Sequence, residues 1–373
     1  MEILYFINQI TNSGGIERIV IDKINYLANN PNLSVSLAYY GSISDKPFYS
    51  IDEKVKLYPI TANVESHSFV KKVLNIKKVY SSVNKIIHAV KPSVIINANV
   101  WVISYFLPFI HRNIPKIIEL HFSYDGLQIM NREIYQSNKL KIFINEELRR
   151  LVYPRYSKCI VLTNDDRKKW AFKNIAVIPN FTNIKRNENA CYTREKIAIN
   201  VGRLEYQKNH ELLLNAWHVV SRTYPDWKLE IWGEGSLKEK LMEQIVKLNL
   251  LDKVYLKGVS NEISKQYQRA SFFVLSSRYE GQPLVVIEAM RMGLPCVCIS
   301  ITGTNDVIED GKNGYIVSTS DIESLAECIK KMIASMNRFD EFSKNAIASS
   351  KKYEKNNVMD MWISLFFQLA KEE

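Results

Sequence analysis

Short apolar runs alternate with amphipathic stretches along most of the chain. Residues 3–7 (ILYFI) are wholly apolar, and the stretch 16–30 repeats its apolar positions every three or four residues. The first pattern is typical of a buried strand, and the second predicts a helix with one buried face. Further strand-like runs lie at 33–40, 93–99, 116–122 and 158–163. This alternation predicts a doubly wound α/β domain with a parallel sheet.

The rhythm breaks between residues 177 and 195. This stretch holds a proline, four asparagines and mixed charges but little periodicity, which is typical of an interdomain linker. A second alternation of strands and helices then runs from about residue 197 to residue 317. The sequence therefore predicts two Rossmann-like domains, at 1–183 and 184–355. The apolar stretch at about 356–373 needs a surface to cover it.

The composition is that of an ordinary globular protein. The chain has 373 residues, of which 46% are apolar and 24% charged, so it is long enough for two separate cores. Its five cysteines are scattered, which favours reduced thiols in the cytosol over a disulfide framework. No signal peptide is expected, because Met1 leads straight into an apolar run. The uncharged stretch 93–110 is interrupted by polar residues and a proline, so a membrane span is not expected there.

Positive charge is concentrated in the first half of the chain. Residues 1–183 hold 24 Lys and Arg against 14 Asp and Glu, whereas residues 184–373 hold 26 against 25. A basic half favours an acidic partner, such as anionic lipid headgroups or a diphosphate-linked substrate. Nucleic acid is not expected, because no recognition motif accompanies the charge. A lysine-rich helix that contacts only solvent is the alternative interpretation.

The most informative motif is a pair of glutamates, Glu280 and Glu288, on either side of the turn 281–283. An apolar run follows this turn. If Pro283 begins a helix, the free amides there form an anion site. Glu280 would then stand at the start of the helix, with Glu288 about two turns further along on much the same side. Such an arrangement suits a polyhydroxylated ligand that carries phosphate, and a nucleotide sugar is one.

Two cations follow the first strand of the second half. Arg203 comes directly after Gly202, and Lys208 follows five residues later. Because ligands bind at the carboxyl ends of strands in α/β sheets, these side chains could hold a diphosphate and stabilise it as it leaves. A solvated pair on a loop is the alternative. Gly233, after the next strand, permits close approach of a ligand or forms an ordinary turn.

Candidate chemistry in the first half is sparser. Gly14 and Gly15 lie between a strand and a helix, where a ligand loop and a plain turn fit equally well, since SGGIER is not GxGxxG. His121 ends a strand and could contact a substrate hydroxyl, although a lone histidine is more often structural. The chain contains no HExxH, DxD or P-loop. Neither a dedicated metal site nor ATP-driven chemistry is therefore expected.

In combination these motifs resemble the retaining glycosyltransferases of the GT-B fold, family 4 of the nucleotide-sugar-dependent enzymes. The resemblance covers nearly the whole chain in family order: SGGIER, IIELHF, VLTNDD with VIPNF, VGRLEYQKN, IWGEG, LKG, EGQPLVVIEAM and EDGKNGYIV. It implies two Rossmann-like domains facing across a cleft. The N-terminal domain would bind the acceptor, the C-terminal domain would bind the nucleotide-sugar donor, and the last helix would cross back onto the N-terminal domain.

The resemblance also implies roles for single residues. Arg203 and Lys208 would hold the diphosphate, Glu280 would bind hydroxyls of the donor sugar, and His121 would contact the transferred sugar. Glu288 would bind the ribose hydroxyls. The other implied donor contacts are Gly14, Gly15, Gly202, Gly233, Gly258, Val259, Gly281, Gln282, Pro283 and Leu284. The sequence departs from the family at Gln282, where an aromatic or aliphatic residue is more usual, at Asn209, where glycine is frequent, and at Asp306, where many members have Glu.

The implied reaction moves a hexose or N-acetylhexosamine from a nucleotide sugar, most often a UDP-sugar, to a glycan or polyprenyl-diphosphate-linked acceptor. Such enzymes build surface polysaccharide, capsule or lipopolysaccharide, and the family needs neither metal nor cofactor. The expected location is the cytoplasm, with peripheral contact at the inner membrane face as an open question. The alternatives are a nucleotide-sugar epimerase, a glycan phosphorylase, which needs a longer chain, and a catalytically silent sugar-nucleotide binder, which would have lost a key charge.

Overall fold

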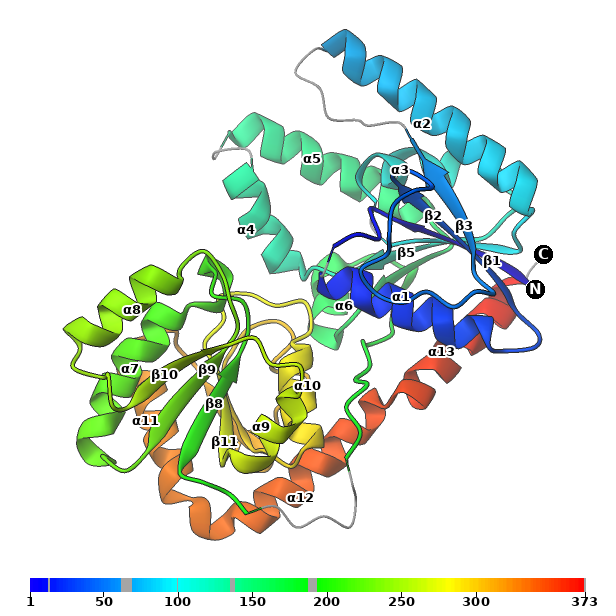
Figure 1. Ribbon diagram of the computed structural model, residues 1–373. Helices are drawn as coiled ribbons and strands as arrows, with labels where there is room; N and C mark the ends of the chain where they lie inside the picture. Colours follow the sequence, from blue (N-terminus) through cyan, green and yellow to red (C-terminus); the bar gives the residue numbers. More distant parts are fainter. Residues whose placement is uncertain (13, 62–68, 99, 135–137, 187–192, 372–373) are drawn as a thin grey trace. The chain divides into compact units, whose positions relative to one another are not determined.

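The computed structural model of the protein describes residues 1–12, 14–61, 69–98, 100–134, 138–186 and 193–371. It divides into two compact units, which are Met1–Pro179 with Val358–Glu373, and Asn180–Asn357. Each unit is a sheet covered by helices (Figure 1). The boundary expected from the sequence, at residue 183, falls in the same short segment as the observed one.

The N-terminal unit contains a seven-stranded sheet whose neighbouring strands are all parallel. Its strands are β1 (Glu2–Ile7), β2 (Ser34–Tyr40), β3 (Lys56–Ile60), β4 (Val94–Asn97), β5 (Lys116–Leu120), β6 (Lys158–Val161) and β7 (Ile175–Val177). They lie in the order β3-β2-β1-β4-β5-β6-β7, so the order reverses between β1 and β4. Doubly wound sheets bind ligands at the carboxyl ends of the strands beside such a reversal.

The helices of this unit follow the predicted alternation. They are α1 (Gly15–Ala28), α2 (Phe69–Val90), α3 (Trp101–Phe106), α4 (Tyr124–Ile134), α5 (Lys139–Val152) and α6 (Asn164–Trp170), with short 3-10 helices at Leu107–Phe109 and Tyr153–Arg155. The last helix, α13 (Lys355–Leu369), belongs to this unit from Val358 onward. It buries Trp362 and Phe366, and the ammonium of Lys23 on α1 lies 4.4 Å from the Trp362 ring centroid. The apolar face of the C-terminal stretch is therefore covered by the N-terminal unit.

The C-terminal unit contains a six-stranded parallel sheet in the order β10-β9-β8-β11-β12-β13. Its strands are β8 (Ile197–Val201), β9 (Lys228–Trp232), β10 (Val254–Gly258), β11 (Phe272–Leu275), β12 (Cys296–Ile299) and β13 (Gly314–Val317). Its helices are α7 (His210–Thr223), α8 (Lys238–Lys247), α9 (Ile263–Arg269), α10 (Leu284–Arg291), α11 (Ile322–Ala334) and α12 (Phe339–Ser350), with 3-10 helices at Tyr206–Lys208, Met336–Arg338 and Lys351–Tyr353. The predicted doubly wound architecture is confirmed in both units.

Helices bury both faces of the C-terminal sheet. In β11, Phe272 and Val274 pack into one apolar cluster with residues of α7, α8 and α11. Phe273 and Leu275 point to the opposite face and pack with residues of α9, α10 and α12. Successive strand residues alternate between faces, so a strand that is buried on both sides reads as a continuous apolar run. This explains why no polar alternation marks β11 or β12 in the sequence.

The described cysteines are free thiols, as the sequence suggested. Cys159, Cys296 and Cys298 are buried and Cys328 is half-buried, whereas Cys191 lies outside the described residues. Burial raises the pKa of the Cys296 thiol well above its usual range. A buried thiol with a raised pKa is unreactive, so these side chains act as small apolar core residues.

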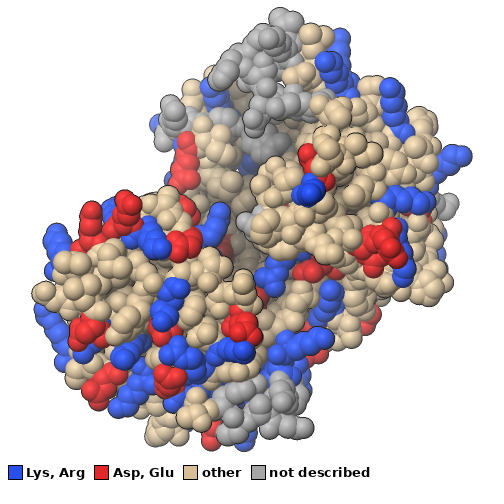
Figure 2. Space-filling view, viewed as in Figure 1, with Lys and Arg blue, Asp and Glu red and all other residues tan. Residues whose placement is uncertain are grey.

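Basic side chains are prominent on one helix of the N-terminal unit. Lys77, Lys78 and Lys85 on α2 are exposed, and blue side chains stand out in the region of this helix in Figure 2. Over the face of the C-terminal unit seen in the same view, basic and acidic side chains are interspersed. This distribution matches the charge excess that the sequence places in residues 1–183.

Candidate active site

The strongest candidate site lies at the carboxyl ends of β8 and β11 in the C-terminal unit. These strands are neighbours at the point where the strand order reverses. After β8 the chain passes Gly202 and Arg203 and forms the 3-10 turn Tyr206–Lys208. After β11 it passes two serines and reaches Glu280. The topology thereby brings together two loops about 70 residues apart in the sequence, at the edge where ligands bind in such sheets.

Lys208 and Glu280 form an ion pair in this site. The Lys208 ammonium lies 2.6 Å from Glu280 Oε1, and the two side chains are 14% and 10% exposed. The Ser277 hydroxyl donates to the same carboxylate oxygen at 2.8 Å, and the Gln207 amide donates to the other oxygen at 3.3 Å. Three donors therefore fix the Glu280 carboxylate in one orientation, and the ammonium is held beside it.

Backbone contacts hold the two loops against each other. The Ser276 hydroxyl donates to the carbonyl of Lys208 at 2.9 Å, and the amide of Arg278 donates to the carbonyl of Gln207 at 2.8 Å. Asn209, which follows Lys208, has a φ of 53° in the left-handed region. Asparagine tolerates this conformation better than most residues other than glycine, which explains how it stands where the family often has Gly.

Two glycines give Lys208 its room. A Cβ atom on Gly202 would lie 3.1 Å from Cε of Lys208, so the lysine stem packs directly over this backbone. Gly233 has a φ of 149°, and a Cβ there would overlap the carbonyl oxygen of Gly202. Gly233 is therefore required by its own backbone conformation and by the close approach of the Gly202 backbone, whereas a side chain on Gly202 would press on the lysine stem.

Arg203 is placed differently from Lys208. Its side chain is exposed, and within the described residues no carboxylate lies within 4.0 Å of its guanidinium. The neighbouring Glu205 accepts instead from the amide and hydroxyl of Ser236, both at 2.8 Å. The structure thus brings Lys208 to Glu280 and leaves the Arg203 guanidinium open to solvent at the same loop.

Glu288 lies on α10, which begins at Leu284 with Pro283 as the residue before its first turn. The Glu288 side chain is buried, and the Tyr267 hydroxyl is 3.5 Å from Oε2. The turn before α10 is covered by the loop at Gly303, where a Cβ would lie 2.6 Å from the Gly281 carbonyl oxygen. The turn and the helix start are consequently fixed.

Gln282 is turned toward the first residues of the C-terminal unit. Its side-chain oxygen accepts from the Asn180 amide at 2.6 Å, and the residue is buried. Among the other predicted donor contacts, Gly258 has a φ of 71°, and its carbonyl accepts from the Gly233 amide at 2.8 Å. Val259 beside it is 72% exposed.

The family profile described as glycosyl transferases group 1 matches residues 181–349, which make up most of the C-terminal unit. Two relatives align over nearly the whole chain. An uncharacterized glycosyltransferase of Haemophilus influenzae is 27% identical over 96% of this chain and 98% of its own length. The amylovoran biosynthesis glycosyltransferase AmsD of Erwinia amylovora is 28% identical over 97% of this chain and 98% of its own length.

A solved structure extends the similarity to the fold. An S. aureus TarM variant in complex with fondaparinux, alpha-GlcNAc-glycerol and UDP has 18% sequence identity and a TM-score of 0.74, covering 98% of this chain and 99% of TarM. The chain is a GT-B glycosyltransferase. The structural similarity to TarM covers both Rossmann-like units of this glycosyltransferase. The segment that the group 1 profile matches contains Lys208, Glu280 and Glu288.

In the N-terminal unit of the glycosyltransferase, His121 is buried beside a charged pair. Its Nε2 lies 3.2 Å from Glu119 Oε2, and the same oxygen pairs with the ammonium of Lys23. Burial alone would raise the pKa of Glu119, but Lys23 and His121 together lower it to about 2. The predicted sugar contact is therefore engaged with a carboxylate inside the unit. The sequence signal for this cluster is a glutamate within the apolar run KIIELHF, because a buried charge needs a partner.

Gly14 and Gly15 lie at the start of α1. Gly15 is its first residue and Gly14 precedes it in an extended conformation. A Cβ on Gly14 would overlap the carboxylate of Glu17, so the glutamate side chain folds back over this glycine. The group that approaches the Gly14 backbone closely in this structure is therefore the Glu17 side chain of the same helix.

His210 was not predicted as a site residue from the sequence. It is buried two positions after Lys208, and its Nε2 lies 3.0 Å from the Asn200 side-chain oxygen. Burial, and secondarily the charge of Lys208, lower the pKa of His210 to about 4. The ring is therefore neutral near pH 7 and ties α7 to β8 rather than exchanging protons with a ligand.

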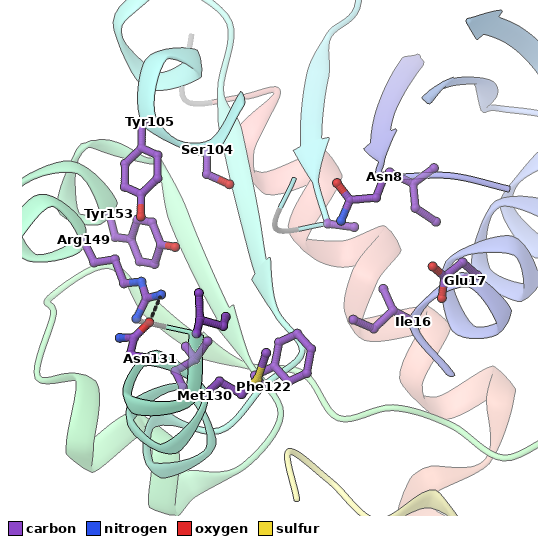
Figure 3. Close-up of a pocket in the computed structure, with 14 residues that line it drawn as sticks. Asn8, Ile16, Glu17, Ser104, Tyr105, Phe122, Met130, Asn131, Arg149 and Tyr153 are labelled. Atoms are coloured by element: carbon purple, nitrogen blue, oxygen red, sulfur yellow. Dashed lines mark hydrogen bonds between the residues drawn. The ribbon is translucent and has the colours of Figure 1, made fainter. Parts of the chain in front are cut away.

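The N-terminal unit contains a pocket of about 260 Å³ at the carboxyl ends of β1, β4 and β5. Asn8 and two residues of α1 lie on one side of it, and residues of α3, α4 and α5 lie on the other (Figure 3). None of its lining residues was among the predicted site residues. They are Ile7, Asn8, Ile16, Glu17, Ala98, Ser104, Tyr105, Phe122, Leu127, Met130, Asn131, Ile134, Arg149 and Tyr153.

Two features are absent from the described residues. No group of three or more His, Cys, Asp or Glu side chains is arranged there to hold a metal ion. None of the helices in this part of the chain has both the length and the apolar character that crossing a membrane requires.

Proposed function

We propose that this enzyme is a retaining, family 4 glycosyltransferase. It transfers a hexose or N-acetylhexosamine from a UDP-sugar to a glycan or polyprenyl-diphosphate-linked acceptor in surface polysaccharide biosynthesis. The observation that carries the proposal is the Lys208–Glu280 pair at the carboxyl edge of β8 and β11. It sets a cation for a leaving diphosphate beside a carboxylate for sugar hydroxyls.

In the proposed reaction the bond between the anomeric carbon and the donor phosphate breaks, and the acceptor hydroxyl attacks from the same face. The leaving phosphate takes the proton of that hydroxyl, so the anomeric configuration is retained. Lys208 and Arg203 stabilise the negative charge that develops on the phosphate. Glu280 positions the sugar and does not attack it, because a carboxylate that accepts three hydrogen bonds is a poor nucleophile.

The TarM complex supports UDP as the nucleotide and retention as the stereochemical outcome, because its name includes UDP and alpha-GlcNAc-glycerol. An α-linked product beside UDP is what retention from an α-linked UDP-sugar would leave. The amylovoran biosynthesis role named for AmsD supports a polysaccharide pathway. In the proposed mechanism the cations of the β8 loop replace a metal ion at the diphosphate.

UDP is expected to bind the C-terminal unit without added metal. At 100 times its Kd, a ligand that binds only the folded state adds about 2.7 kcal/mol of stability. We expect thermal unfolding of the enzyme to shift upward with UDP, and the shift to be the same with EDTA. GDP in place of UDP tests the base. No shift with any nucleotide would contradict the donor assignment, and a shift abolished by EDTA would contradict metal independence.

The Glu288→Gln variant tests the ribose contact within the same titration. Removing a charged acceptor of ribose hydroxyls is expected to weaken UDP binding about 10-fold. The matched control is Glu309→Gln in the same unit, since Glu309 is exposed and pairs with Lys312 at 2.9 Å. Equal affinities of the two variants for UDP would count against the role of Glu288.

We further propose that the enzyme works in the cytoplasm and contacts an anionic membrane through α5. This helix exposes Leu140, Phe143, Ile144, Leu148 and Leu151, which are between 43% and 68% exposed. Their spacing of three and four residues places them along one face, with exposed lysines at 139 and 141 beside it. A helix with an apolar stripe and flanking basic residues suits the surface of an anionic bilayer.

Flotation with phosphatidylglycerol-containing vesicles tests this contact. We expect binding that weakens as salt shortens the Debye length below about 8–10 Å. Phe143→Ser or Leu151→Ser should reduce the bound fraction about 10-fold, because each removes a large apolar side chain from the contact. Leu251→Ser, at a 61% exposed leucine of the C-terminal unit, is the control. Equal flotation of all variants, or none for the wild type, would contradict the proposal.

A further inference from the structure

Arg149 is a buried cation that lines the pocket of the N-terminal unit. It lies on α5 and is 7% exposed. Its Nη2 donates to the side-chain oxygen of Asn131 on α4 at 3.2 Å. Within the described residues no carboxylate comes within 4.0 Å of its guanidinium. The one acidic residue that lines the pocket, Glu17, comes from α1 and lies well apart from Arg149 in Figure 3.

An unpaired buried guanidinium is unusual on physical grounds. Arginine stays protonated in proteins at any working pH. Burying its charge is unfavourable unless an anion and hydrogen bonds compensate it. Neutral amide and hydroxyl groups around Arg149 satisfy some of its five N–H donors but bring no counter-charge. A pocket with such a group is therefore suited to a ligand that supplies the anion.

Asn131 holds Arg149 in place through its side-chain oxygen. It is 1% exposed, and its oxygen accepts from both Arg149 Nη2 and Asn145 Nδ2, each at 3.2 Å. Asn145 is itself oriented by the Tyr105 hydroxyl, which donates to its oxygen at 2.7 Å. With its oxygen engaged by two donors, Asn131 must present Nδ2 elsewhere, and this nitrogen has no hydrogen-bond partner among the described residues. That nitrogen is also shielded from solvent, so Asn131 orients the guanidinium and leaves the Arg149 N–H groups to bind an oxyanion.

We infer that this pocket binds an oxyanion carried by the acceptor, either a phosphate or a carboxylate, through Arg149, which Asn131 holds in place. The inference rests on the proposed function, in which the N-terminal unit holds the acceptor. Much of the remaining lining is apolar, including Ile16, Phe122 and Met130. The volume of about 260 Å³ lies just below the range of about 300–1,000 Å³ typical of drug-sized ligands. One charged group on a monosaccharide-sized body therefore suits the pocket.

Two small probes separate the sources of the anion. Methyl phosphate and acetate are titrated against the full-length enzyme at constant ionic strength, and unfolding temperature is recorded. We expect a saturable upward shift with at least one probe, and the probe that acts identifies phosphate or carboxylate. In Arg149→Gln the apparent affinity should fall at least about 10-fold, because the charged donor is lost.

Asn131→Asp is the second variant, in case Arg149→Gln fails to fold. It sets a carboxylate against the guanidinium with little change in shape, so it should stabilise the free enzyme and compete with the probe. Arg150→Gln is the control, because Arg150 is the next residue of α5 and its side chain is 76% exposed. Wild-type probe binding in Asn131→Asp, or no saturable shift in the unaltered enzyme, would overturn the inference.

UDP titration of the same proteins keeps the two proposals apart. UDP binding that is unchanged in Arg149→Gln and Asn131→Asp, alongside lost probe binding, supports an acceptor-side anion site. UDP binding without any probe binding overturns the anion site and leaves the donor assignment standing. Probe binding without UDP binding supports the oxyanion site but contradicts the proposed UDP-sugar donor.

Discussion

Replacing Lys208 with alanine is expected to lower kcat about 100-fold or more. The ammonium is the one cation that the described structure pairs with Glu280, at 2.6 Å, and Gly202 holds its stem against the end of β8. In the proposed reaction it stabilises a phosphate that gains charge only as the bond to the sugar breaks. Removing a charge stabiliser of this kind typically costs 10²–10³ in kcat.

The loss should appear in turnover more than in folding. Without Lys208, the Glu280 carboxylate still accepts from Ser277 and Gln207, so the loop keeps its main supports. The measurement is kcat at saturating donor, together with the unfolding temperature of each variant. Lys238→Ala is the matched control, since Lys238 pairs with Glu234 at 2.8 Å in the same unit but is 50% exposed. Turnover of Lys208→Ala within a few-fold of the control would refute the assignment.

The fold was predictable because it depends on patterns that the chain displays locally. Apolar runs of strand length alternate with stretches of helical period, and this alternation has one common solution, the doubly wound parallel sheet. The Glu280 loop was recognisable for a related reason. Its two glutamates lie on either side of a short turn that an apolar run follows, so the whole pattern lies within one short stretch of the chain.

The sequence did not predict which of the two cations pairs with Glu280, because Arg203 and Lys208 were both expected to hold the diphosphate. The choice depends on the 3-10 turn Tyr206–Lys208 and on the left-handed conformation of Asn209. Both turn the chain so that Lys208 points back over Gly202, whereas Arg203 stays exposed. Local turn geometry of this kind has no periodic signal.

The N-terminal pocket was missed for a different reason. Arg149 reads as one of two adjacent arginines on an amphipathic helix, and Arg150 beside it is 76% exposed. Only the packing of α5 against α4 buries one of them beside Asn131. A contact between two helices is a tertiary fact, and a helical charge pattern alone is more often a solvated face. The same holds for Lys23 and Glu119, which are 96 residues apart.

Replacing Glu119 with glutamine is expected to destabilise the N-terminal unit by about 3–5 kcal/mol. Lys23 and Glu119 pair with each other at 3% side-chain exposure, and the Lys23 ammonium also lies over the Trp362 ring. Burial lowers the pKa of Lys23, an effect that Glu119 offsets only in part. Breaking a buried pair by removing one partner leaves the other charge uncompensated, which costs about that much. Calorimetric unfolding of the N-terminal unit measures the loss.

The pH dependence gives the same ion pair a second signature. The pKa of Glu119 is about 2 in the folded unit, against about 4.3 for an unperturbed glutamate. Its contribution to stability is therefore complete above about pH 5 and disappears as the pH falls toward 2. Glu119→Gln should flatten this part of the stability profile, whereas Glu147→Gln, at a surface glutamate that pairs with Arg150 at 3.4 Å, should not.

The double variant Lys23→Met with Glu119→Gln separates a lost attraction from a stranded charge. If the cost of Glu119→Gln is the unpaired ammonium, removing Lys23 as well should recover most of the lost stability, because apolar replacement of a buried pair is often neutral. An additive loss in the double variant would mean that the pair itself, and not the stranded lysine, holds α1 to β5. His121, 3.2 Å from the same carboxylate, would then owe its position to that pair.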